Sequence, residues 1–195
     1  MGSSRLVIGG ARSGKSEFAE QLLAEATGRK GYIATSRIGD PEMRERVRTH
    51  RARRPSAWTT FELPTSDMKA LADILPQADI FLFDCVTMYV NNLLLDELGD
   101  LGSDVSVVFS ESEIERITER LRGEMATLET LLNAHDAQVI FVTNELGMGI
   151  VPNNAMSRLY RDLVGLANQE LGAISSQVEL VMAGIPVRLK RGEGQ

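Results

Sequence analysis

Residues 9–16 of the chain read GGARSGKS, a glycine-rich stretch that ends in lysine and serine. The pattern G-x-x-x-x-G-K-[ST] is matched at Gly9, Gly14, Lys15 and Ser16. In this pattern backbone N–H groups surround phosphate oxygens, the lysine reaches the β and γ phosphates, and the hydroxyl binds Mg²⁺. An apolar run at 6–8 precedes the stretch and a helical pattern follows it, so a chance match to a glycine-rich turn is the weaker alternative. The stretch predicts a phosphate-binding loop for ATP or GTP.

A second possible nucleotide-binding motif lies at residues 80–84. The sequence IFLFD there predicts an apolar strand that ends in a carboxylate. Any buried strand can end in aspartate, so this run alone decides little. With a phosphate loop upstream, Asp84 is expected in the Mg²⁺ shell of the nucleotide. Ser16 and Asp84 are therefore the predicted metal ligands.

The rest of the chain alternates short apolar runs with longer amphipathic stretches, which predicts an α/β fold. We expect a P-loop NTPase-like architecture: a mostly parallel central sheet flanked by helices, with a C-terminal antiparallel hairpin strand after the turn at 184–186. The expected strands are 6–8, 32–34, 59–62, 80–84, 139–143, 178–182 and 187–190. The expected helices are 15–26, 41–54, 66–75, 87–95, 112–134 and 155–175, with Ser112 and Glu115 as a capping box for the fifth.

Composition limits the classes of function. A length of 195 residues suits one domain over 1–195. The net charge of −6 argues against broad affinity for nucleic acid or anionic membranes. Cys85 is the only cysteine, which excludes an intramolecular disulfide and fits a reducing compartment. Since no apolar run approaches the ~20 residues of a membrane helix, we expect a cytoplasmic protein with no membrane insertion and no nucleic-acid partner.

A basic segment at residues 41–54 reads PEMRERVRTHRARR and places His50 among six arginines. One interpretation is a solvated basic helix face, with His50 as a core residue beside Met43 and Val47. The other is that the arginines bind a polyphosphate and His50 attacks it. Guanidinium groups match phosphate oxygens, and a neutral imidazole can form a covalent phosphoramidate.

Several blocks extend these motifs along the chain. They are GGARSGKS at 9–16, YIATS at 32–36, DPEMRERVRTHRARRP at 40–55, Trp58 with Glu62, LFDCVTMYVNNLL at 82–94, TNELGMGIVP at 143–152 and RLYRDLVGLANQ at 158–169. In order and spacing they resemble the bifunctional adenosylcobinamide kinase and adenosylcobinamide-phosphate guanylyltransferase family of cobalamin biosynthesis. Met88 and Tyr89 stand where the family more often has Leu and Trp.

The resemblance implies two reactions at one nucleotide site. ATP or GTP first phosphorylates adenosylcobinamide. GTP then transfers GMP through a guanylyl-histidine, which falls on His50, to the phosphorylated corrinoid, with loss of pyrophosphate. The implied nucleotide contacts are Gly9, Gly10, Ala11, Arg12, Ser13, Gly14, Lys15, Ser16, Ala34, Thr35, Ser36, Arg51, Ala52, Arg53, Arg54, Glu62 and Asp84. The family also implies a homotrimer.

Two further groups of residues are candidates for the nucleotide or substrate site. Glu62 ends an expected strand, and its carboxylate can accept hydrogen bonds from the N1–H and 2-amino groups of guanine. Asn144, Glu145 and the glycine-containing run 147–149 follow another strand, at the edge where α/β sheets bind ligands. We expect them to shape the active site, and the alternative is a plain strand-to-helix turn.

Three competing functions remain open. The first is a P-loop small-molecule kinase without nucleotidyl transfer, in which His50 is structural. The second is a nucleotide-controlled binding module. The third, nucleic-acid binding through the basic segment, is disfavoured by the negative net charge and by an aromatic content of 5%.

Overall fold

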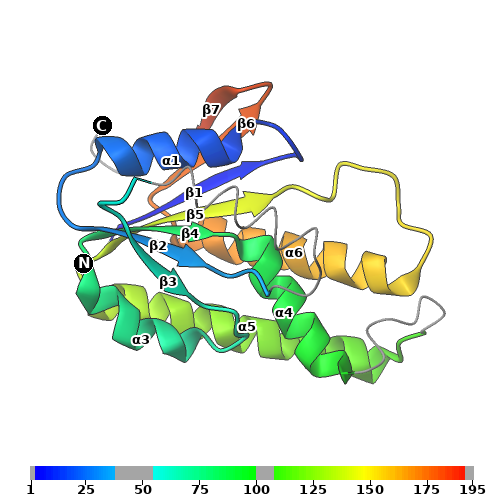
Figure 1. Cartoon of the computed structure of the whole chain (residues 1–195). Coiled ribbons are helices and arrows are strands. Elements are labelled where there is room, and N and C mark those ends of the chain that lie inside the picture. The colour runs from blue at the N-terminus through cyan, green and yellow to red at the C-terminus, as the bar shows by residue number, and fades with distance from the viewer. Residues whose placement is uncertain (1–2, 38–54, 100–107, 192–195) are drawn as a thin grey trace.

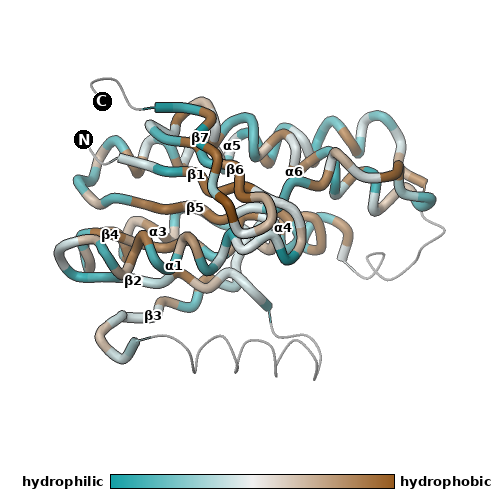
Figure 2. Tube along the Cα trace, turned by 90° about the horizontal axis from the view of Figure 1, so that it is seen from above, coloured by the Kyte–Doolittle hydropathy of each residue, from teal (hydrophilic) through white to brown (hydrophobic). Residues whose placement is uncertain are grey.

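The computed structural model describes residues 3–37, 55–99 and 108–191. These residues form a seven-stranded sheet in the order β3-β2-β4-β5-β1-β6-β7, which Figure 2 shows from above. The strands are β1 (Ser4–Gly9), β2 (Lys30–Ala34), β3 (Thr59–Glu62), β4 (Ile80–Asp84), β5 (Gln138–Asn144), β6 (Gln177–Met182) and β7 (Ile185–Lys190). Among the described strands β7 alone runs antiparallel, against β6. The expected fold class is confirmed.

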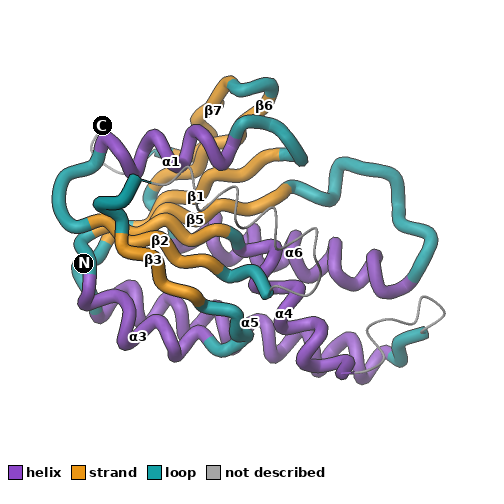
Figure 3. Tube along the Cα trace, viewed as in Figure 1, coloured by secondary structure: helices purple, strands orange, loops and turns teal. Residues whose placement is uncertain are grey.

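Helices cover both faces of the sheet (Figure 1). One face carries α1 (Lys15–Glu25), whose buried Ala19 and Leu23 pack on apolar residues of the strands. The other face carries the remaining helices of the described residues, and Figure 3 shows them as a separate layer. They are α3 (Leu71–Ile74), α4 (Val86–Leu98), α5 (Glu111–Ala134) and α6 (Ala155–Ile174). This burial on both faces explains the continuous apolar runs of β4 and β5.

The prediction of one continuous helix at 66–75 is wrong. The structure breaks it into a 3₁₀ turn at Met68–Ala70, the short α3 and a second 3₁₀ turn at Leu75–Gln77. Asp67 caps the first turn by accepting the N–H of Lys69 at 2.9 Å. Pro76 lies in the last turn and has no N–H to continue a helical ladder. The predicted helix at 41–54 lies outside the described residues.

The predicted cap of α5 is also corrected. The capping box consists of Ser110 and Glu113, not Ser112 and Glu115, and the helix begins at Glu111. The Ser110 hydroxyl accepts the N–H of Glu113 at 3.3 Å, and the Ser110 N–H donates to the Glu113 carboxylate at 2.8 Å. Both pairs have the same spacing, so the sequence pattern could not distinguish them.

The predicted C-terminal hairpin strand is confirmed, but its turn lies at 183–184 and not at 184–186, because β7 begins at Ile185. Ala183 and Gly184 join β6 to β7, and both have positive φ, 51° and 78°. Within the described part of the chain, no helix has the length and apolar character needed to cross a membrane.

Candidate functional site

The glycine-rich loop connects β1 to α1, as the sequence predicts. Gly14 occupies the N-cap of α1 in the left-handed conformation, and no side chain caps the helix. The N-terminal N–H groups of α1 therefore face the loop without a competing side-chain acceptor, which is the arrangement that binds phosphate. Lys15 is largely buried, and its Nζ donates to the carbonyl of Gly10 at 3.1 Å.

Two glycines of the loop are required by close packing. A Cβ on Gly9 would lie 2.5 Å from the carbonyl oxygen of Val181. A Cβ on Gly14, whose φ is 93°, would lie 3.0 Å from the Cα of Gly184. The N–H of Gly184 also donates to the carbonyl of Ser13 at 2.8 Å. The β6–β7 turn therefore packs against the phosphate loop.

The predicted nucleotide contacts of four strands lie at the carboxyl edge of the sheet. Ala34 is in register with both Asp84 of β4 and Glu62 of β3. Gly9 is in register with Asn144 of β5. Glu62 lies on β3, four strands from β1, about 19 Å at the usual strand spacing. The predicted residues His50 and Arg51 to Arg54 lie outside the described residues.

Asp84 is half-buried at the end of β4, and the hydroxyl of Tyr32 donates to its carboxylate. The carboxylate of Asp84 and the hydroxyl of Ser16 are oxygen donors, the kind that Mg²⁺ prefers. Among the described residues no group of three or more His, Cys, Asp or Glu side chains could hold a metal ion. A site with one carboxylate and one hydroxyl suits Mg²⁺, which usually binds through one or two carboxylates together with substrate phosphates and water.

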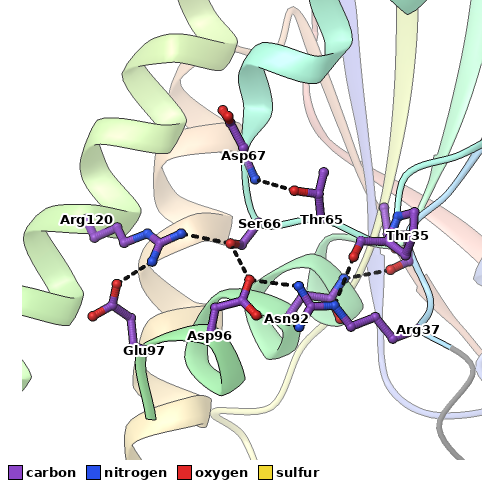
Figure 4. Close-up of polar contacts among 10 residues, drawn as sticks. Thr35, Arg37, Thr65, Ser66, Asp67, Asn92, Asp96, Glu97 and Arg120 are labelled. Carbon is purple, nitrogen blue, oxygen red and sulfur yellow. Dashed lines mark hydrogen bonds and ion pairs between the residues drawn. The ribbon is translucent and has the colours of Figure 1, made fainter. Parts of the chain in front are cut away.

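Thr35 shapes the end of β2 from inside the protein. Its side chain is fully buried, and its hydroxyl accepts the N–H of Cys85 and donates to the Cys85 carbonyl, both at 2.8 Å. The side-chain amide of Asn92 donates to the Thr35 carbonyl at 2.8 Å (Figure 4). These contacts hold the backbone of Ala34 and Ser36 at the carboxyl edge of the sheet. The contacts of Ala34, Thr35 and Ser36 with nucleotide stay predictions.

Cys85 follows Asp84 directly and is the one thiol of the chain. Burial, followed by the charge of Asp84, raises the pKa of the Cys85 thiol to about 11. The positive charge of Lys15 opposes this shift. Since only the thiolate is a good nucleophile, Cys85 stays protonated and inert at neutral pH.

A polar network fixes the end of β5 beside the loop. The Asn144 side chain donates to the Thr87 hydroxyl at 3.1 Å, and the Asn168 side chain donates to the Asn144 carbonyl at 3.0 Å. The Thr143 hydroxyl donates to Asn168 at 2.7 Å. Glu145, the next residue, donates its N–H to the carbonyl of Gly9 at 3.1 Å.

Three residues that contribute to the site were given no role in it by the sequence analysis: Tyr32, Asn92 and Gly184. Asn92 carries a weak signal, because it is a polar residue on the mostly apolar buried face of α4. Tyr32 reads as one more apolar residue of a strand, and Gly184 as one more turn glycine. Their roles depend on contacts with residues that are distant in sequence. Tyr32 and Asp84 are 52 residues apart, Asn92 and Thr35 are 57 apart, and Gly184 and the phosphate loop are further apart still.

The fold and the loop together define a P-loop nucleotide-binding protein. Two solved ATPase structures share this fold, each with a TM-score of 0.53. One is a prototypical ATPase from the type III secretion system of pathogenic bacteria, at 16% identity over 92% of this chain and 52% of that one. The other is the assembled ATPase EscN of enteropathogenic E. coli, at 14% identity over 93% of this chain and 43% of that one.

The chain belongs to the family described as cobinamide kinase / cobinamide phosphate guanyltransferase, whose model matches residues 5–189. The bifunctional adenosylcobalamin biosynthesis protein CobU of Escherichia coli strain K12 is 41% identical over 95% of this chain and 98% of that relative. CobU of Salmonella typhimurium has the same identity and coverage. The bifunctional protein CobP of Pseudomonas aeruginosa is 37% identical over 95% of this chain and 96% of its own.

Proposed function

We propose that this protein is a bifunctional transferase of cobalamin biosynthesis that performs both reactions of its family at one nucleotide site. The observation that carries the proposal is the family match over residues 5–189, which includes the phosphate loop and the carboxyl edge of the sheet. The full-length relatives named as bifunctional adenosylcobalamin biosynthesis proteins support the same assignment.

The first reaction is phosphoryl transfer from ATP or GTP to adenosylcobinamide. A hydroxyl of the acceptor attacks the γ-phosphorus, a new P–O bond forms, and the bond to the nucleoside diphosphate breaks. Lys15 and the N-terminal N–H groups of α1 stabilise the charge on the phosphate oxygens, and the backbone of Gly9 to Gly14 orients them. Ser16 and Asp84 would hold Mg²⁺, which when bound would supply positive charge for the phosphates.

The second reaction is guanylyl transfer through His50. The neutral imidazole attacks the α-phosphorus of GTP, and pyrophosphate leaves. An oxygen of adenosylcobinamide phosphate then attacks the guanylyl phosphorus, releasing the imidazole and giving adenosylcobinamide-GDP. The arginines that flank His50 in the sequence supply positive charge for this transfer.

We also propose a homotrimer located in the cytoplasm. Exposed apolar side chains on β7, at Ile185, Val187 and Leu189, support an assembly of identical subunits. A corrinoid is large for the cleft of one small domain, so a site between subunits suits it.

Incubation with α-³²P-GTP and Mg²⁺ tests the proposal. We expect wild-type protein to form a covalent label that is labile in acid and stable in base, as a phosphoramidate is, and His50→Ala to form none. Wild-type protein that binds GTP and never becomes labelled would contradict guanylyl transfer and favour a kinase without it.

The role of Glu62 in recognising guanine has its own test. Glu62→Gln replaces one acceptor oxygen by a donor, so we expect a reduced preference for GTP over ATP in competition binding. An unchanged preference would exclude Glu62 from base recognition.

A further inference from the structure

The topology of the sheet places one carboxylate next to the phosphate loop that the reactions above leave unused. Strand β5 lies between β1, which leads into the loop, and β4, which ends in Asp84. Glu145 directly follows β5, and its N–H donates to the carbonyl of Gly9, the first residue of the loop, at 3.1 Å. We propose that Glu145 is the general base of the phosphoryl-transfer step, an inference that rests on the proposed function.

Glu145 can be compared with the other carboxylates of this edge. Among the described residues that end or directly follow the six parallel strands, the carboxylates are Glu62, Asp84 and Glu145. Asp84 lies two strands from β1, about 10 Å at the usual spacing, and the Tyr32 hydroxyl donates to it. Glu62 lies about 19 Å from β1 at the same strand spacing. The strand before Glu145 is the direct neighbour of β1, so Glu145 lies nearest to the loop.

The carboxylate of Glu145 is held in one orientation. Its Oε1 accepts the N–H of Gly147, and the side chain is half-buried. The preceding residue, Asn144, is fixed by Thr87 and Asn168. Within residues 3–37, 55–99 and 108–191, Oε2 of Glu145 has no hydrogen-bond partner. One oxygen is therefore positioned by the backbone, and the other is left to accept a proton.

The segment after Glu145 suits a large acceptor. Met148, Ile150 and Val151 are exposed to 82%, 97% and 63%. Figure 1 shows this connection between β5 and α6 extending beyond the edge of the sheet. An acceptor with apolar surface that lies on these side chains has its reacting hydroxyl beside Glu145.

The chemistry of the two reactions differs in its need for a base. In phosphoryl transfer the acceptor is a hydroxyl, whose proton moves to the carboxylate as its oxygen bonds to the γ-phosphorus and the nucleoside diphosphate leaves. In guanylyl transfer the nucleophiles are a neutral imidazole and then a phosphate monoester, which is ionised at pH 7 because its second pKa is about 6. Glu145 therefore serves the first reaction and not the second.

Two assays on the same preparations test this assignment. The first follows ³²P from γ-³²P-ATP to adenosylcobinamide, and the second follows the covalent label from α-³²P-GTP. For Glu145→Gln we expect a fall of roughly 10²- to 10⁴-fold in kcat of phosphorylation with unchanged KM values, since loss of a general base has this magnitude. The label from GTP should persist, which also shows that the variant is folded.

Two comparison variants complete the design. Asp84→Asn should lose both activities, because both need the Mg²⁺-bound nucleotide. Glu129→Gln, on the exposed side of α5, should retain both. Phosphorylation that persists in Glu145→Gln, or a parallel loss of phosphorylation and label, overturns the role of Glu145 as base while wild-type activity still supports the proposed function. Wild-type protein that shows neither activity overturns both.

Discussion

At the scale of single residues, several glycines are explained by atoms that are distant in sequence. Gly31 lies in β2, in register with Phe81 of β4, and a Cβ there would lie 2.3 Å from a carbon of the Phe81 ring. The ring of Phe61 from β3 lies on the same position, with its centroid 5.8 Å from that of Phe81. The two rings occupy the space that a side chain at residue 31 would need.

Gly31→Ala therefore tests the packing of this part of the sheet. Phe81 is fully buried and cannot move away without displacing its neighbours, so we expect a loss of ~1–3 kcal/mol in the free energy of unfolding. Urea denaturation measures it. The matched control is Gly123→Ala in α5, where the added methyl meets open space and should stabilise the helix by up to ~1 kcal/mol. Equal effects at the two positions would contradict the packing argument.

At the scale of elements, a chain of polar contacts joins the end of β2 to α4 and α5 (Figure 4). Arg37 forms two hydrogen bonds with the carboxylate of Asp96 in α4, at 2.6 and 2.7 Å. The Ser66 hydroxyl donates to Asp96 at 2.6 Å and accepts from Arg120 of α5 at 2.8 Å. These contacts fix Arg37, which is the last described residue before 38–54.

The ion pair of Arg37 and Asp96 makes the free energy of unfolding depend on pH. Hydrogen bonding by Arg37 lowers the pKa of Asp96 to about 2, below its value in the unfolded chain. The stabilisation is therefore complete above about pH 4 and is lost as pH falls through about 2. Both side chains are about one third exposed, so we expect only about 1 kcal/mol between wild type and Asp96→Asn at pH 7.

Urea denaturation from pH 7 to pH 2 should show this gap closing as the pH falls. Asp73→Asn, at an exposed position of α3, serves as the control and should show no such gap. A difference between wild type and Asp96→Asn that widens in acid would contradict the sign of this prediction.

The segment between β5 and α6 makes a separate prediction about the acceptor. Replacing the exposed Met148 and Ile150 by serine removes apolar contact area and leaves the phosphate loop intact. We expect a higher KM for adenosylcobinamide in the phosphorylation assay and unchanged labelling by GTP. An unchanged KM for the corrinoid would place the acceptor elsewhere.

At the scale of the whole molecule, the predicted nucleotide contacts of the described residues lie at the carboxyl edge of the sheet, and β7, the last strand of the sheet, carries exposed apolar side chains. Every residue of β7 is exposed, and Ile185, Val187 and Leu189 recur at alternate positions. Alternate residues of a strand share one face. An unpaired edge strand with an apolar face is a surface on which a second copy can pack.

The proposed trimer predicts an assembly that depends on this strand. We expect sedimentation velocity to report three subunits for wild type and smaller species for Val187→Asp, because the charge would be buried without a partner. Arg188→Ala, a change on the other face of β7, should leave the assembly intact. A monomeric wild type would contradict the trimer, and a trimeric Val187→Asp would place its interface elsewhere.

Local sequence determined the positions of the strands and of the phosphate loop in this protein. The apolar runs that became β1 to β7 are short and bounded by turn residues, and the loop at Gly9 to Ser16 is a contiguous motif whose chemistry depends on neighbouring backbone groups. Strand positions and the phosphate site therefore follow from local order. The break in the helix at 66–75 also has local causes, since Asp67 caps its first turn and Pro76 has no N–H for a helical ladder. Where this segment lies does not follow from local order, because the carboxylate of Glu124 in α5 accepts the N–H of Met68 at 2.7 Å.

Only the tertiary structure decided how distant segments complete the site. The strand order places β5 between β1 and β4, and this brings Glu145 beside Gly9 although the two are 136 residues apart. Long-range packing also brings the β6–β7 turn against the phosphate loop and the Tyr32 hydroxyl to the carboxylate of Asp84. Sequence periodicity reports which face of an element is buried. Which strands become neighbours depends on long-range packing, since the same local pattern is compatible with several strand orders.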